Sequence, residues 1–125
     1  MLKLAALLVA VTPAIALADK DFTEGSGASY DCSEDPIVNI NHDSGSYTLT
    51  GTCSEIHLNG GNLHVTIAET KQLAINGDGN VVKIHTVGEI LVNGGNNNVR
   101  WKHARSGRRP AVAANGERNS VARSK

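Results

Sequence analysis

The sequence is poor in aromatic residues, cysteine and proline, which limits what it can build. Only 3% of the 125 residues are aromatic, and there are 2 Cys and 3 Pro. Large rings fill thick hydrophobic cores, so a core here must be thin and made mainly of Ile, Val and Leu. The length corresponds to one domain and excludes multi-domain enzymes. The 13 Gly, by contrast, indicate many turns.

A long apolar run is also missing after residue 18, and the run before it has the order of a secretory signal peptide. Lys3 is followed by the apolar stretch Leu4–Val11, a break at Pro13 and an A-x-A site that ends at Ala18. A membrane span needs about 20 apolar residues, and this stretch is shorter. We therefore predict a signal peptide over residues 1–18, cleavage after Ala18, and a mature chain in the periplasm or outside the cell without a transmembrane segment.

The two cysteines, Cys32 and Cys53, are predicted to pair. Export to an oxidising compartment makes an even number of cysteines typical of a disulfide. Two thiolates without C-x-x-C spacing are too few for a metal site. A disulfide closing a loop of this size is expected to stabilise the fold by about 3 kcal/mol.

A repeat of 17 residues organises the middle of the chain. Three stretches, which begin at Ser54, Lys71 and Gly88, align without a gap. An earlier copy aligns after one extra residue, and a later copy follows an insertion around 102–107, although a disordered basic tail is the alternative for that segment. Apolar residues alternate in each copy, which indicates two short strands with one buried face.

Two columns of the alignment are predicted to be structural. The first is a stacked amide ladder of Asn41, Asn59, Asn76, Asn93 and Asn115. The second is a set of turn glycines at Gly60, Gly77, Gly94 and Gly116.

An antiparallel β meander and a parallel β-solenoid both accommodate this unit. In a meander, residues 17 apart lie two strands away and have no reason to match in type. In a solenoid they stack directly at about 4.8 Å, so that like side chains meet. We predict an all-β, single-domain solenoid of about five coils, with the meander as the alternative. Residues 19–35 form an amino-terminal cap, the coils cover 36–125, and the last coil spans 108–125.

Charge is divided along the chain. Residues 19–98 hold 3 basic and 11 acidic residues, whereas residues 99–125 hold 8 basic residues and 1 acidic residue. The candidate contacts to an anionic surface are Arg100, Lys102, Arg105, Arg108 and Arg109. A solvated loop that discourages edge pairing is the alternative. Stacking aromatics are missing beyond Trp101, so no specific nucleic acid is expected as a partner. The sequence does not identify the partner, and the candidates are an envelope protein, an anionic surface or a second copy at the exposed last coil.

No pattern in the sequence indicates catalysis, a metal site or a cofactor. Glu55, Gln72 and Glu89 share an outward column, which places two carboxylates near the separation used by inverting glycosidases. The short turns are not expected to build a cleft around a sugar. We predict a non-catalytic binding or structural module, with a carbohydrate-binding or weakly polysaccharide-acting protein as the alternative.

One family resemblance supports this expectation. Cys32, the stretch Thr48–Cys53 and a repeated G-x-x-N-x-V motif together resemble the secreted bacterial family labelled domain of unknown function 3060. The motif stands at Gly77–Val82, Gly94–Val99 and Gly116–Val121. The copy at Gly60 departs from it, because Asn62 comes one position early. The resemblance covers about 30–123 and implies an exported, β-rich module with no assigned activity.

Overall fold

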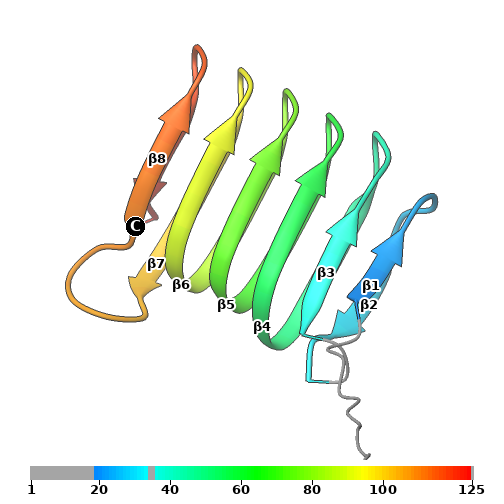
Figure 1. The fold of residues 1–125 in the computed structure, drawn as a ribbon, viewed down its shortest axis with the longest axis horizontal. Helices are drawn as coiled ribbons and strands as arrows, with labels where there is room; N and C mark the ends of the chain where they lie inside the picture. The colour runs from blue at the N-terminus through cyan, green and yellow to red at the C-terminus, as the bar shows by residue number, and fades with distance from the viewer. Residues whose placement is uncertain (1–18, 34–35, 125) are drawn as a thin grey trace, which may run out of the picture.

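The protein is a parallel β-solenoid, drawn in Figure 1 from a computed structural model that describes residues 19–33 and 36–124. The predicted signal peptide lies outside the described residues. Those residues contain no helix, and hence none long enough to cross a membrane. The strands are β1 (Asp19–Phe22), β2 (Ala28–Asp31), β3 (Ile37–Ile40), β4 (Ser46–Asn59), β5 (His64–Asn76), β6 (Val81–Asn93), β7 (Asn98–Ala104), β8 (Ala111–Asn115) and β9 (Ser120–Arg123).

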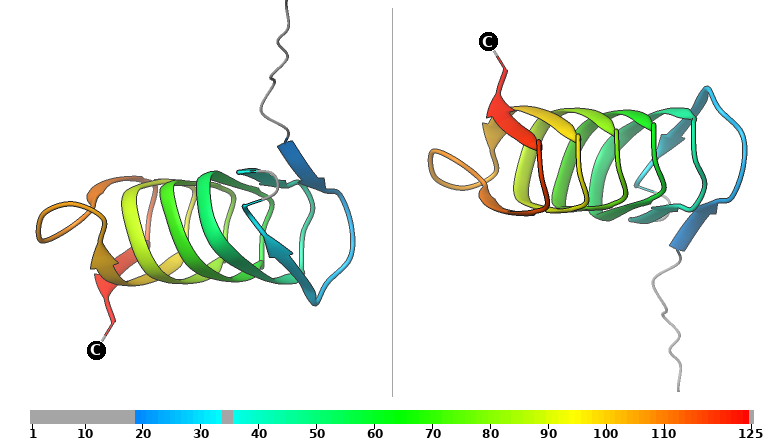
Figure 2. Two further views of the ribbon diagram at one scale, coloured as in Figure 1. Left: turned by 90° about the horizontal axis from the view of Figure 1, so that it is seen from below. Right: turned by 90° about the horizontal axis from the view of Figure 1, so that it is seen from above.

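Every strand pairing among the described residues is parallel, and the strands line two faces. One face runs β1, β3, β4, β5, β6 and β8. The other face runs β2, β4, β5, β6, β7 and β9, and Figure 2 shows both faces as successive coils along one axis. The predicted solenoid is confirmed, and the antiparallel meander is wrong.

The structure has about six coils, one more than predicted. Residues 19–31, which we assigned to a cap, pair with the next coil in the same parallel register and form the first coil themselves. At the other end, β8 and β9 pair with β6 and β7, so the carboxyl-terminal segment is a coil and not a disordered tail.

The strands β4, β5 and β6 are longer than the two short strands predicted for each copy. Hydrogen-bonded pairing continues around the bend between the faces, as at Thr70↔Val87, so each strand crosses both faces. The extra residue of the earlier copy is a bulge in β4 between Leu49 and Thr52, where Gly51 has a φ of 75°. Cys53 lies in this bend and forms the predicted disulfide with Cys32, at a Cα separation of 5.0 Å.

The core is a thin file of aliphatic side chains stacked from coil to coil. Ile56, Leu73 and Ile90 are in register on neighbouring coils and are fully buried. Burying each such side chain contributes about 1.5 to 3 kcal/mol. The few residues per coil that face inward explain how the fold forms with so few aromatic rings.

The tight corners hold the two columns predicted to be structural. Neighbouring residues of the asparagine column hydrogen-bond side chain to side chain, with N···O distances from 2.8 to 3.2 Å. The links join Asn41, Asn59, Asn76, Asn93 and Asn115 in that order. The four turn glycines stack at the next position, where a Cβ on Gly77 would lie 2.0 Å from the carbonyl oxygen of Gly60. Only glycine lets the corners approach this closely.

A second asparagine ladder, which the sequence did not lead us to predict, lies inside the corner. It consists of the motif residues Asn80, Asn97 and Asn119. Asn80 and Asn97 are 0% and 1% exposed, and each amide group donates to the side-chain oxygen of the next coil and to a glycine carbonyl. Leu63 takes this place in the departing copy and donates its backbone N–H to the Asn80 side chain. The G-x-x-N-x-V motif is therefore a corner built of satisfied buried amides.

Candidate functional site

The two ends of the solenoid differ, and the amino-terminal end is closed by aromatic rings. The Phe22 ring packs against Tyr30 and Tyr47, with centroid distances of 5.9 and 4.9 Å. The ammonium group of Lys20 lies 5.3 Å from the centroid of the Phe22 ring, over the outer side of this cluster. The Tyr47 hydroxyl is hydrogen-bonded to His42 and donates to the Gly25 carbonyl, so its polar tip is satisfied.

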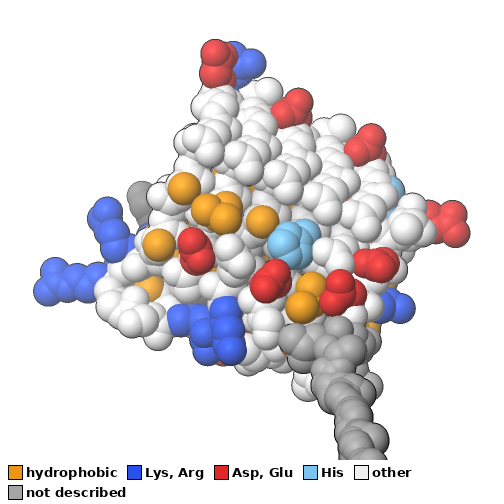
Figure 3. Space-filling view, viewed as in Figure 1, with side chains coloured by type: hydrophobic (Ala, Val, Ile, Leu, Met, Phe, Trp, Pro, Cys, Tyr) orange, Lys and Arg blue, Asp and Glu red, His pale blue; other side chains and the backbone are white. Residues whose placement is uncertain are grey.

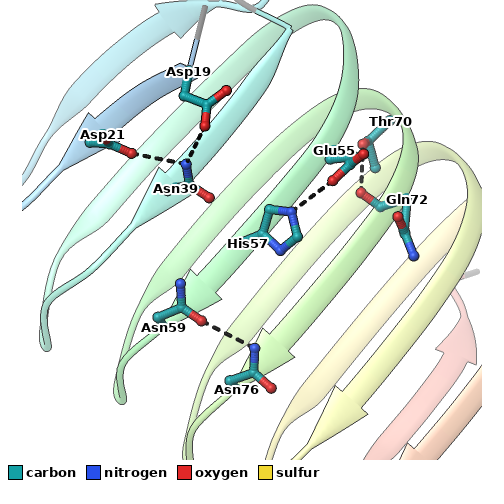
Figure 4. A network of polar contacts seen from close by, with 9 residues as sticks. All are labelled: Asp19, Asp21, Asn39, Glu55, His57, Asn59, Thr70, Gln72 and Asn76. Carbon is teal, nitrogen blue, oxygen red and sulfur yellow. Dashed lines mark hydrogen bonds and ion pairs between the residues drawn. The ribbon is translucent and has the colours of Figure 1, made fainter.

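The amino-terminal end is acidic on its outer surface. The Asn39 amide donates to Asp21 at 2.9 Å and to Asp19 at 3.5 Å, so these side chains meet beside β1 and β3 (Figure 4). At the end of β2, hydrogen bonds from the hydroxyl and amide of Ser33 lower the pKa of the Asp31 carboxyl below its usual range. The Asp31 carboxyl is therefore held in its charged form.

The carboxyl-terminal end, by contrast, is open. Val112 and Val121 continue the inward columns of Ile90 and Val99, but no described strand covers them on the far side. Val112 is 47% exposed, whereas Ile90 is fully buried. Arg123 lies in register with Trp101 and places its guanidinium 4.6 Å from the ring centroid.

A hollow of about 850 Å³ opens over the last coil. We call its apolar lining the floor and its arginines the rim. The floor contains Trp101, Val112 and Val121, and the rim contains Arg108, Arg109 and Arg123. Part of the lining comes from the loop between β7 and β8, which Figure 2 shows projecting past the last coil along the axis. The hollow is therefore bounded by the end of the core on one side and by this loop on another.

The predicted anionic contacts are not all free. Arg105 donates to Glu69 at 2.9 Å, which neutralises it on the side of β5. Arg108 and Arg109 make no ion pair with any described residue, and Arg100 donates to the Ser120 hydroxyl at 3.1 Å. The structure thus divides the five predicted residues between the loop and the outward side of β7.

Two residues of β6, Lys83 and His85, also lie on this outward side, although they were not among the predicted contacts. Lys83 on β6 is in register with Arg100 on β7. Both line a shallow hollow of about 370 Å³ together with His85 and Lys102. We call these four residues the basic face. Alternation along β6 places Lys83 and His85 outward, and the register shows that they adjoin the β7 cations.

The outward column of Glu55, Gln72 and Glu89 is in register on three coils, as expected. Figure 4 shows Glu55 turned toward His57, to which it is hydrogen-bonded at 2.9 Å. Figure 3 shows this side of the solenoid as a continuous surface on which the carboxylates are dispersed. No group of three or more His, Cys, Asp or Glu side chains in the described ranges 19–33 and 36–124 is arranged to hold a metal ion.

The carboxyl-terminal end therefore combines an apolar floor, an arginine rim and an adjoining basic face. Comparison of the chain with family models, curated proteins and solved structures found no match.

Proposed function

We propose that the protein is an exported, non-catalytic binding module that attaches to anionic surfaces through the basic face. The described part of the chain is a rigid stack of coils, and its cations are concentrated at one end. Figure 3 shows Lys and Arg side chains gathered mainly at the end that carries β8 and carboxylates spread toward β1. This polarity orients the molecule, because an anionic surface attracts one end and repels the other.

The observation that carries the proposal is the unpaired charge of the basic face. Lys83, Arg100 and Lys102 make no ion pair with a described residue, and their side chains reach solvent from adjacent strands. Charges left unpaired in this way are available to a polyanion or to acidic lipid headgroups. Each contributes about 1 kcal/mol at a negatively charged membrane surface.

The test is binding of the mature chain to vesicles of phosphatidylglycerol and phosphatidylcholine over a range of salt concentrations. We expect the Arg100→Gln, Lys102→Gln double variant to bind phosphatidylglycerol vesicles about tenfold or more weakly than the original chain. The matched control is the Lys71→Gln, Arg118→Gln double variant, which removes the same charge from elsewhere. Equal losses in the two variants, or binding that does not weaken with salt, would contradict the proposal.

Carbohydrate binding on the outward column is the second candidate, and the shared register of Glu55, Gln72 and Glu89 favours it. We rank this candidate below binding through the basic face, because the carboxylates are dispersed on a flat surface. A glycan array with the original chain and a Glu55→Gln, Glu89→Gln variant separates the two. Glycan binding that the double variant abolishes would support this candidate.

A further inference from the structure

We propose that the hollow at the open end binds one anionic amphiphile, with its aliphatic chain on the floor and its phosphate or carboxylate at the rim. This inference rests on the proposed function, because it assigns a ligand class to the same basic end. It differs in its site, since the rim and floor lie on the axis of the solenoid and the basic face lies on its side.

The floor is core that the last coil leaves uncovered. Trp101 closes the preceding coil and is 6% exposed, but Val112, which stacks on Ile90 in the last coil, is 47% exposed. The residues that precede Val112 in its column are fully buried aliphatics, with one exception, Lys20 in the first coil. An aliphatic chain lying on Val112 and Val121 would remove from water the surface that a further coil would have covered, and the burial of this apolar surface favours binding.

The rim places positive charge beside this apolar surface. Arg108 and Arg109 have no ion-pair partner among the described residues. The Arg123 guanidinium is held over the Trp101 ring and also donates to the Arg108 carbonyl, which fixes it at the boundary between floor and rim. Guanidinium groups bind phosphate and carboxylate oxygens through paired N–H donors. The hollow lining contains no acidic residue to compete with such a ligand.

The size of the hollow and the position of the loop favour a small ligand over a second copy of the chain. A volume of about 850 Å³ lies within the range of about 300 to 1,000 Å³ typical of small-molecule sites. A second copy that continued the solenoid would stack its β1 and β2 edges flush against β8 and β9. The loop between β7 and β8 projects past the last coil and stands in the way of such stacking (Figure 2).

The single tryptophan of the chain, Trp101, lies in the floor and reports directly on this site. Dodecyl phosphate, added below its micelle-forming concentration, should change Trp101 fluorescence saturably and with one-to-one stoichiometry. Inorganic phosphate alone should leave the fluorescence unchanged and compete only weakly. A response to inorganic phosphate as strong as the response to dodecyl phosphate would overturn the proposal, because the floor would then contribute nothing.

Variants of the two halves of the hollow have matched controls. We expect the Arg108→Gln, Arg109→Gln double variant to weaken dodecyl phosphate binding by about tenfold or more. We expect the same of the single variant Val112→Asp. Ala113→Asp introduces the same charge on the outward side of β8 and should cause less loss than Val112→Asp. Circular dichroism checks folding, and the arginine pair tests the proposal even if Val112→Asp fails to fold. Equal losses from Val112→Asp and Ala113→Asp would contradict it.

Two further outcomes are decisive. The Arg100→Gln, Lys102→Gln variant should keep its fluorescence response while losing vesicle binding, so each proposal can fail without the other. Sedimentation velocity at each titration point should show a monomer. A fluorescence change that depends on protein concentration and accompanies dimer formation would mean that a second copy occupies the hollow, which would overturn the amphiphile site.

Discussion

The two ends of the solenoid differ in how the core of the first and last coils is covered. Three of the four aromatic residues of the chain, Phe22, Tyr30 and Tyr47, close the amino-terminal end, and Trp101 alone lies at the other. At each end a cation stacks on an aromatic ring, Lys20 on Phe22 and Arg123 on Trp101. Both cations stand in strand register with a buried core residue of the neighbouring coil. Every parallel solenoid must cover its first and last coil or expose core and strand edges.

The difference indicates which end is built for stability and which for contact. The amino-terminal coil is fastened by the disulfide, by ring packing and by hydrogen bonds to the next coil. The carboxyl-terminal coil holds small inward residues and a basic loop, and all of β8 is exposed. Regions of low local stability are those from which binding surfaces are commonly drawn.

The largest expected effect is loss of the disulfide at the closed end. Replacing Cys32 and Cys53 together by Ala should lower the free energy of unfolding by about 3 kcal/mol, because the unfolded chain regains the entropy of the open loop. Urea denaturation of the mature chain measures this change. A loss below about 1 kcal/mol would show that the amino-terminal coil is held by packing alone and would weaken the contrast between the ends.

Truncating one apolar side chain at each end should give unequal effects. Phe22→Ala removes a ring packed against two others and should cost about 2 kcal/mol, less than for a fully buried ring because Phe22 is partly exposed. Val112→Ala should cost less than about 0.5 kcal/mol, because that side chain already meets water. Equal costs in urea denaturation would mean that the carboxyl-terminal end is as closed as the other.

Removing the stacked cations compares the two ends at one kind of contact. Lys20→Gln and Arg123→Gln should each lower stability by about 0.5 to 1 kcal/mol. Only Arg123→Gln should also weaken dodecyl phosphate binding, since Lys20 lies at the opposite end. A loss of binding from Lys20→Gln would place the ligand elsewhere.

The smallest expected effect is a dependence on alkaline pH at the closed end. Burial raises the pKa of the Tyr47 phenol above its ordinary value of 10.0. The neutral phenol is therefore favoured in the folded state, and its contribution is fully present below pH 10 and is lost as pH rises through the folded pKa. The free energy of unfolding, measured from pH 9 upward, should fall less in Tyr47→Phe than in the original chain. An identical fall would contradict this assignment.

The repeating middle of the chain was predictable because residues in one column of the alignment stack on one another in neighbouring coils. The two ends were not predictable in this way. Ile56, Leu73 and Ile90 match in type at a constant spacing, which favoured a solenoid over a meander. The first coil escaped prediction because it lacks the corner motif and because β2 pairs with β4 at an offset different from that of the later copies. Val112 aligns with buried residues, and it is exposed because no described strand pairs with β8 on its far side, which the alignment column does not reveal.

The basic end was predictable in sign but not in arrangement. Counting charges located it, but ion pairing of Arg105 with Glu69, thirty-six residues earlier, depends on the bend of β5 and the path of the loop. The adjoining Lys83 stands one repeat of 17 residues before Arg100, so the repeat places the two together, but the charge count placed Lys83 in the acidic part of the chain. The turn glycines and the asparagine ladder that begins at Asn41, in contrast, were visible because the same residue type recurs on successive coils.

Backbone hydrogen exchange of the mature chain, followed residue by residue, compares the stability of the closed and open ends of the solenoid. The amide of Cys32 donates to Thr50 at the closed end, and those of Ser120 and Ser124 donate to Asn97 and Trp101 at the open end. We expect slow exchange at Cys32, exchange about tenfold or more faster at Ser120 and Ser124, and slowing of these two alone by dodecyl phosphate. Equal protection at the two ends, unchanged by dodecyl phosphate, would contradict this expectation.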